Sequence, residues 1–278
     1  MLLATDLDGT FLAGDPDSRL KLYQLVVSHP EIQLVFVTGR GLESVLPLLS
    51  DPTLPQPDYI ICDVGGTVVD GRTQQPVQAI QGEIDNLWPG ERLIEESVAH
   101  IEGLQRQEVP QERRCSYFCS VDAVTDELKG IVEDLGCDLL YSSNKFLDVL
   151  PRGVNKGKTL RNLVEHLQIE QSHVLVAGDT LNDLSLFEQG YNGVCVGASE
   201  KGLLTATENS TRVLHAQAPG CGGILEAIEH FGFLGTKGIA AETQDVLEPG
   251  QSDLVIVYHR LPYEEVEENG KMIRRRPK

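Results

Sequence analysis

The chain alternates between short apolar runs and polar segments at which the runs end. Five runs have the length and the aliphatic or β-branched composition of buried parallel strands: residues 2–4, 32–37, 59–64, 172–177 and 192–196. Segments with helical spacing of apolar residues lie between or after them, at 19–28, 45–49, 156–167, 184–188 and 222–231. This alternation predicts an α/β fold whose core is a doubly wound, Rossmann-like parallel sheet.

The rhythm changes between residues 70 and 150. Strand-like pieces at 115–121, 138–141 and 146–150 alternate there with helix-like pieces at 92–107 and 124–135. We interpret residues 70–150 as an inserted α+β cap domain, which divides the core domain into residues 1–69 and 151–232. Residues 233–251 have the small, polar and acidic composition of a linker. An apolar run at 254–258 then predicts a strand at the start of a further domain, residues 252–278.

Composition restricts the partners that the protein can have. The 278 residues are enough for about two domains, and 41% of them are hydrophobic. The formal net charge of −19 argues against general binding to nucleic acid or to an anionic membrane. Without a membrane-spanning run or a signal-peptide pattern, we expect a cytoplasmic protein with no membrane partner. The six cysteines are dispersed, and we expect reduced, mostly buried thiols.

Polar residues follow the predicted core strands. Asp6 and Asp8 stand one residue apart after the first strand, and like charges so close are costly unless a cation or a positive ligand neutralises them. An exposed turn with two solvated acids is the alternative. Further polar groups follow later strands or begin a helix: Thr38-Gly39-Arg40, Gly65-Gly66-Thr67, Lys156, and Gly178-Asp179-Thr180-Leu181-Asn182-Asp183.

These groups together meet the needs of phosphoryl transfer through a covalent intermediate. That chemistry uses a carboxylate nucleophile, a hard cation bound by oxygen ligands, and positive or hydroxyl groups around the phosphate. A zinc site is not expected, because no histidine stands at metal-ligand spacing from a cysteine or another histidine.

Four of these segments resemble, in order and spacing, the motifs of the haloacid-dehalogenase-like phosphatase superfamily. They are Asp6-Leu7-Asp8-Gly9-Thr10, Thr38-Gly39-Arg40, Lys156-Gly157 and Gly178 to Asp183. The insertion between the second and third motifs resembles the cap of the subclass that contains sucrose-phosphate phosphatase and related sugar phosphatases. The resemblance covers about residues 1–232 and implies a phosphoric monoester hydrolase that uses Mg²⁺ as cofactor and a small-molecule sugar phosphate as substrate.

The resemblance also implies a role for each acid. Asp6 attacks phosphorus and forms an aspartyl-phosphate, while Asp8 protonates the leaving alcohol and later activates water. Mg²⁺ is held by Asp6, the backbone carbonyl of Asp8 and Asp179, with Asp183 as a further ligand or directly behind the ligands.

Phosphate binding is expected from Thr38 and Lys156, with Asn182 orienting one of these groups. For Thr38 the alternative is a helix N-cap, and for Lys156 a solvated helix lysine such as the neighbouring Lys158. Arg40, beside Gly39, is either a substrate contact or part of a surface ion pair.

Further substrate contacts are expected from the segment Gly65-Gly66-Thr67, for which a tight turn is the alternative. In the cap, five residues are candidates for sugar contacts, each equally plausible on a solvated face: Arg113, Arg114, Tyr117, Asn144 and Lys145. Cys119 is expected to belong to the core rather than to act as a nucleophile.

The last 27 residues, from Ser252, resemble the start of a glycosyltransferase of the trehalose-phosphate-synthase type, glucosylglycerol-phosphate synthase in particular. This implies a phosphatase fused to, or associated with, the glycosyltransferase that makes its substrate, and so points to glucosylglycerol phosphate, a compatible-solute precursor. An ordinary C-terminal tail is the alternative. Sucrose-6-phosphate, trehalose phosphate and mannosylglycerate phosphate are the rival substrates, and a catalytically silent module that senses sugar phosphate is the rival function.

Overall fold

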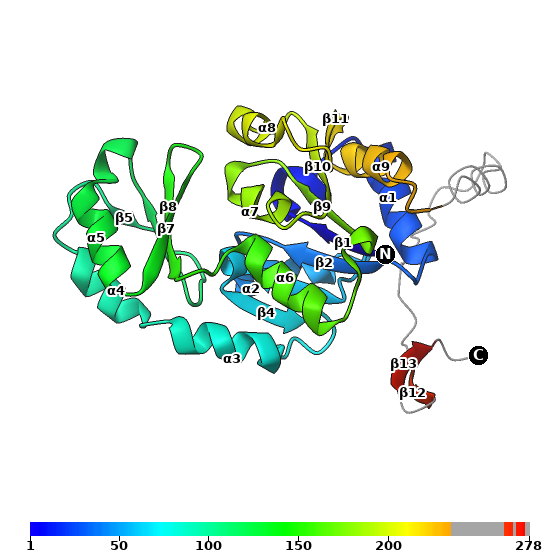
Figure 1. Cartoon of the computed structure of the whole chain (residues 1–278), viewed down its shortest axis with the longest axis horizontal. Helices are drawn as coiled ribbons and strands as arrows, with labels where there is room; N and C mark the ends of the chain where they lie inside the picture. The colour runs from blue at the N-terminus through cyan, green and yellow to red at the C-terminus, as the bar shows by residue number, and fades with distance from the viewer. Residues whose placement is uncertain (235–263, 269–270, 276–278) are drawn as a thin grey trace.

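A seven-stranded sheet forms the centre of the larger part of the molecule (Figure 1). The computed structural model describes residues 1–234, 264–268 and 271–275. All neighbouring strands of the sheet are parallel except the last two, which form an antiparallel hairpin. The strand order is β11 (Val213–Pro219), β10 (Asn192–Gly197), β9 (Val174–Gly178), β1 (Leu2–Thr5), β2 (Gln33–Val37), β3 (Tyr59–Cys62) and β4 (Thr67–Asp70).

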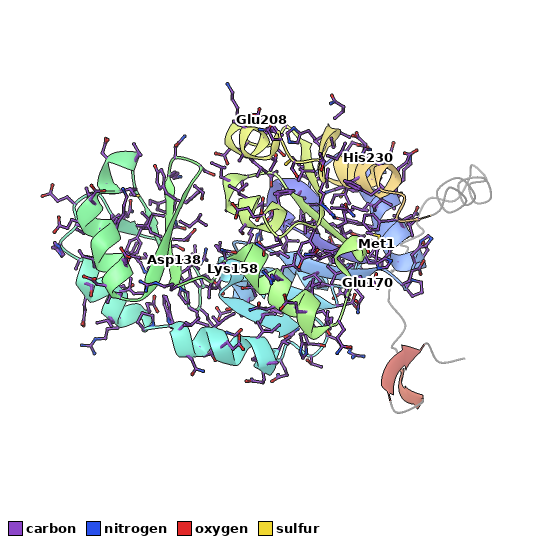
Figure 2. The ribbon with its side chains drawn as sticks, in the orientation of Figure 1. Met1, Asp138, Lys158, Glu170, Glu208 and His230 are labelled. Carbon is purple, nitrogen blue, oxygen red and sulfur yellow. The ribbon has the colours of Figure 1, made fainter. Side chains whose placement is uncertain are left out.

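Helices cover both faces of this sheet, and side chains fill the layers between (Figure 2). One face packs against α1 (Pro16–Ser28), α2 (Leu42–Val45) and α9 (Cys221–His230). The other packs against α3 (Gln78–Leu87), α6 (Lys156–His166), α7 (Leu184–Phe187) and α8 (Lys201–Thr207). In β1 all four residues are buried, with Leu3 toward the first layer and Leu2 and Ala4 toward the second. The predicted doubly wound α/β fold is therefore confirmed.

A four-stranded antiparallel sheet stands beside this core (Figure 1). Its order is β5 (Gln105–Arg106), β6 (Cys115–Phe118), β8 (Phe146–Pro151) and β7 (Cys137–Ser142). Two helices, α4 (Glu91–Val98) and α5 (Asp126–Asp134), pack against one face. Because side chains alternate along a strand, the paired residues Tyr117 and Leu147 face these helices, and the paired residues Ser116 and Asp148 belong to the opposite face.

The helix predicted over residues 92–107 is wrong in its second half. The helix α4 ends at Val98, and Gln105–Arg106 instead pairs with β6. Ile101 and Leu104 continue the helical spacing, but they pack on the cap core from a turn. That turn contains Gly103, whose φ of +83° no helix contains. Within residues 1–234 the pattern also missed the strands β4 and β11 and the helices α3 and α8.

The helix α3 lies within the range predicted for the cap, but it packs against the core sheet. Its buried residues Ile80 and Ile84 belong to the same cluster as Leu160 and Leu163 of α6. We therefore propose that the inserted domain begins after Leu87 rather than at residue 70.

The described end of the chain is a hairpin of β12 (Glu264–Glu268) and β13 (Lys271–Arg275). The strand predicted at 254–258, and residues 235–251 of the predicted linker, lie outside the described residues. None of the helices in the described ranges has both the length and the apolar character that a bilayer crossing requires.

Candidate active site

Three carboxylates meet at the ends of two adjacent strands. Asp6 follows β1 and Asp179 follows β9, and the Asp6 N–H donates to the Ala177 carbonyl at 2.9 Å, which holds the two strand ends together. Oxygens of Asp6, Asp179 and Asp183 all lie within 4.8 Å of one another. This is the edge at which an α/β sheet of this kind binds its ligands.

Asp183 is fully buried and shapes the loop that carries Asp179. Its Oδ2 accepts the backbone N–H groups of Asp179 at 3.0 Å and Thr180 at 3.1 Å. Its other oxygen, Oδ1, accepts Lys156 Nζ at 2.6 Å. Asp183 therefore both stabilises the loop and adds its charge to the cluster.

Lys156, the first residue of α6, is completely buried beside the acids. Its Nζ donates to Asp6 Oδ1 at 2.7 Å and to Asn182 Oδ1 at 3.0 Å, in addition to Asp183. Lys158, labelled in Figure 2, is exposed. Of the two lysines it is thus Lys156 that lies in the cluster, and Asn182 has the contact expected of a residue that orients it.

Two residues of the first motif adjust the position of Asp179. Gly9 has φ of +81°, and a Cβ at this position would lie 2.1 Å from Asp179 Oδ2. The Thr10 hydroxyl donates to Asp179 Oδ1 at 2.9 Å. The sequence predicted no role for Thr10, although a hydroxyl two residues after Asp8 was the signal for one.

Burial dominates the electrostatics of the cluster. It raises the pKa of Asp6 to about 8, despite the attraction of Lys156, and it raises the pKa of Asp179 to about 6, with the negative charge of Asp183 adding to the shift. Burial alone would lower the pKa of Lys156, but Asp183 and Asp6 outweigh it and raise this pKa, so the ammonium stays charged. Three acids around one ammonium carry an excess of negative charge, and this oxygen donor set fits a hard divalent cation.

The second motif follows β2, the neighbour of β1 on the side away from β9. Arg40 holds Asp8 in a two-bonded ion pair, with Nε 2.7 Å from Oδ2 and Nη2 2.6 Å from Oδ1. Arg40 therefore forms the ion pair that was one of its two predicted roles, and its partner is Asp8. Thr38 is buried, and its Oγ1 accepts the Arg40 N–H at 3.1 Å within a local turn. The N-cap alternative for Thr38 is wrong, because Gly41 is the N-cap of α2. The Thr38 hydroxyl hydrogen remains available for a phosphate oxygen.

A cleft of about 370 Å³ opens from these residues toward the cap, a volume suited to a small glycoside. Asp6, Asp8, Gly39, Arg40 and Asn182 line its core side. The other lining residues are Gly41, Ser44, Val64, Gln107, Val109, Pro110, Arg114, Ser142, Ser143, Phe146, Asp148 and Thr180.

Of the five cap candidates, the cleft contains Arg114. Tyr117 faces the cap helices instead, and Arg113 pairs with Asp85 and Glu112. Lys145 lies over the rings of Phe118 and Phe146, and Asn144 is not among the lining residues. Cys119 belongs to the apolar core of the cap, as expected.

The segment Gly65-Gly66-Thr67 does not line the cleft in the described part of the chain; Val64 lies there instead. The three residues form the turn and first position of the β3–β4 hairpin, and the Thr67 hydroxyl donates to the buried Asp63 at 2.9 Å. Gly65 has φ of +109°. This segment is therefore the tight turn that was the alternative. The sequence interpretation did not single out Asp63, although it follows a strand as Asp6 does.

Comparison with known proteins gives concordant matches. The sucrose-6F-phosphate phosphohydrolase family matches residues 1–232. A mannosylfructose-phosphate phosphatase of Agrobacterium fabrum is 32% identical over 83% of this chain and 96% of its own length. The sucrose-phosphatase of Synechocystis sp. PCC6803, solved in complex with sucrose and phosphate, has a TM-score of 0.76 and 30% identity over 84% of this chain and 98% of that one.

A glucosylglycerol-phosphate synthase of Pseudomonas anguilliseptica is 60% identical over 279 residues. The match covers 100% of this chain and 37% of that protein, so the chain spans little more than a third of this relative.

Fold and matches together define a phosphatase of the haloacid-dehalogenase-like class. Within that class, the chain belongs to the sucrose-6F-phosphate phosphohydrolase family.

Proposed function

We propose that the chain is a Mg²⁺-dependent phosphatase that hydrolyses glucosylglycerol phosphate through an aspartyl-phosphate on Asp6. The cluster of Asp6, Asp179 and Asp183 around the buried Lys156 is the observation that supports the mechanism. The 60% identity to a glucosylglycerol-phosphate synthase supports the substrate, because a fused or associated synthase would supply it. Sucrose-6-phosphate is the second candidate, favoured by the family match and by the likeness to a sucrose-phosphatase.

Asp6 is the proposed nucleophile. Its Oδ1 accepts Lys156, which leaves Oδ2 free to attack phosphorus. As the new P–O bond forms, the bond from phosphorus to the glycoside oxygen breaks, and that oxygen takes a proton from Asp8. Both Asp8 oxygens are held by Arg40, so Asp8 has to turn away from Arg40 to reach the leaving oxygen.

Hydrolysis of the acyl phosphate completes the cycle. Asp8 takes a proton from a water molecule, whose oxygen attacks phosphorus, and the bond between phosphorus and Asp6 breaks to release inorganic phosphate. Lys156 stays beside Asp6 and balances charge on the transferred group through both steps.

The acids fit Mg²⁺, which would be held by Asp6, Asp179 and the Asp8 carbonyl, with Asp183 behind them. Bound there, Mg²⁺ would offset the charge of the carboxylates and of the phosphate. A sensing module without activity would not need this nucleophile, acid and lysine together.

Phosphate release by the purified chain tests the proposal. Glucosylglycerol phosphate, sucrose-6-phosphate, trehalose-6-phosphate and mannosylglycerate phosphate are compared with Mg²⁺ and with excess chelator. We expect the highest kcat/KM for glucosylglycerol phosphate and no release with chelator. A preference for sucrose-6-phosphate would overturn the substrate assignment, and no release from any ester would support the sensing module.

Asp6→Asn tests the nucleophile, with Asp17→Asn on the exposed surface of α1 as the matched control. The first change should lower kcat at least a thousand-fold, an order-of-magnitude estimate for losing a covalent nucleophile, with unchanged circular dichroism. The control should retain wild-type turnover. Turnover near wild type in Asp6→Asn would remove Asp6 from this role.

A further inference from the structure

The loop between β5 and β6 connects the cap to the core by close backbone contacts. A Cβ on Gly41 would lie 2.1 Å from the Pro110 carbonyl oxygen, and one on Gly66 would lie 3.1 Å from the carbonyl oxygen of Arg113. Two core glycines therefore let this cap loop approach the core backbone directly. The loop ends at Arg114, immediately before β6.

Arg114 bridges the two domains with a buried guanidinium, and its side chain is 7% exposed. Its Nη2 lies 3.5 Å from Asp63 Oδ1 in the core, and its Nη1 lies 3.4 Å from Asp148 Oδ1 in the cap. Asp63 is fully buried and Asp148 nearly so. Among the described residues that line the cleft, Arg40 and Arg114 are the cations, and Arg40 is already engaged by Asp8.

Two polar atoms of this ion-pair chain have no hydrogen-bond partner among the described residues. They are Arg114 Nε and Asp63 Oδ1. Buried polar atoms in proteins are nearly always hydrogen-bonded, so each such atom calls for an explanation. Asp63 Oδ1 does not reach the cleft and faces the Arg114 guanidinium in the ion pair. For Arg114 Nε the explanation is a ligand, because Arg114 and Asp148 both line the cleft that leads to Asp6.

The backbone at Asp63 is held in an unfavourable conformation. Asp63 and Val64 have φ of +53° and +56°, a region that a β-branched residue such as Val64 rarely adopts. Such conformations persist where the surroundings enforce them, and they gather at functional sites. In this turn they place Val64 in the cleft wall and Asp63 against Arg114.

We propose that Arg114 determines specificity by binding hydroxyl groups of the leaving glycoside, and that Asp63 is the positioning residue that holds it across the domain boundary. The guanidinium offers N–H donors to adjacent hydroxyl oxygens, and the Asp148 carboxylate beside it accepts hydrogen bonds from the same hydroxyl groups. Asp63 does not line the cleft and acts through Arg114. The inference rests on the proposed function, since it names how that site reads its sugar.

The test compares two esters that share the phosphate but not the polyol. Asp63→Asn and Arg114→Gln are assayed with glucosylglycerol phosphate and with p-nitrophenyl phosphate. Each change should raise KM for the glycoside about tenfold, the scale of one lost charged hydrogen bond, with kcat changed less than about threefold. KM for p-nitrophenyl phosphate should change less than about twofold in both variants. The double variant should lose little more than Arg114→Gln alone, because the two residues act through one guanidinium.

Arg106→Gln is the matched control. Arg106 also pairs with two cap carboxylates, Glu91 and Glu95, but it lies over the Tyr117 ring and not in the cleft. Its removal should leave the ratio of the two KM values at the wild-type level. Thr67→Val provides a milder probe that keeps both charges, and it should raise KM for the glycoside in the same direction as Asp63→Asn.

Two results would overturn the inference. One is an equal change of KM for both esters in Asp63→Asn or Thr67→Val, which is what a merely structural role predicts. The other is a KM ratio in Arg106→Gln that shifts as much as in Arg114→Gln. If the wild type releases phosphate from neither ester, the proposed function itself fails, which is a distinguishable outcome.

Discussion

Replacing Gly157 by alanine tests why a glycine follows the buried lysine. Gly157 is the second residue of α6, at the point where this helix meets α7. A Cβ there would lie 1.8 Å from the Ser185 carbonyl oxygen and 2.9 Å from the Leu186 nitrogen, whereas ordinary contacts begin at 3.4 Å. The obstacle is backbone, so no change of side-chain rotamer relieves it, and the two helices have to separate by more than 1 Å.

The expected loss combines two opposing effects. Alanine gains up to about 1 kcal/mol over glycine within a helix. Overpacking a filled site costs about 1–3 kcal/mol, and a clash between backbone atoms belongs at the upper end. We therefore expect the free energy of unfolding to fall by about 2 kcal/mol. Separation of α6 from α7 also moves Lys156 from its 2.7 Å contact with Asp6, and a displacement of about 1 Å at a reacting group lowers turnover about a hundred-fold.

Gly130→Ala in α5 is the matched control, because a Cβ there meets nothing within 4 Å. It should gain up to about 1 kcal/mol of stability and leave turnover unchanged. Urea unfolding and Mg²⁺-dependent phosphate release are measured for both variants and the wild type. If Gly157→Ala were as stable and as active as Gly130→Ala, the close helix crossing would not be what positions Lys156.

Two further changes have outcomes of known sign. Burial raises the pKa of Asp63 from 3.8 to about 6, although the charge of Arg114 acts in the opposite direction. The folded state therefore keeps the Asp63 proton to a higher pH than the unfolded state does. The free energy of unfolding should fall by up to about 3 kcal/mol as the pH rises from 4 through 6. Urea unfolding of the wild type at pH 4 to 7 should show this fall in the free energy of unfolding. The same fall in Asp63→Asn would show that Asp63 is not its source. Gly9→Ala should push Asp179 aside and raise the Mg²⁺ concentration for half-maximal activity about tenfold or more. Gly90→Ala is the control, because Gly90 also has a positive φ, +100°, but a Cβ there meets nothing within 4 Å. It should leave the Mg²⁺ requirement unchanged, and an equal Mg²⁺ requirement in the two variants would refute the steric argument.

Residues at the ends of parallel strands were predictable because their position follows from the fold. An apolar run that stops at Asp6 places this acid at the edge of a parallel sheet, and the neighbouring strand brings Asp179 there as well. The roles assigned to these residues stay predictions, but Asp6, Asp179, Asp183 and Lys156 do gather at this edge of the sheet.

The cap side of the cleft was not predictable in the same way. Whether Tyr117 or Ser116 faces the cap helices depends on strand register, and a shift of one residue exchanges the two faces of the strand. The pairing of Arg114 with Asp63 joins residues from two domains, for which local pattern carries no signal. The end of α4 was missed because Ile101 and Leu104 keep a helical spacing after the helix has stopped.

The turn after β3 shows how the two halves of the cleft depend on each other. By resemblance, Gly66 belongs to a segment expected to face the substrate, yet its neighbours are the carbonyl groups of the cap loop. A larger residue at Gly66 would therefore displace this loop and Arg114 with it, without touching the acids at the end of β1. A change at Gly66 should alter which alcohol is accepted while leaving phosphate chemistry intact, because the loop that it displaces carries Arg114, the proposed sugar contact.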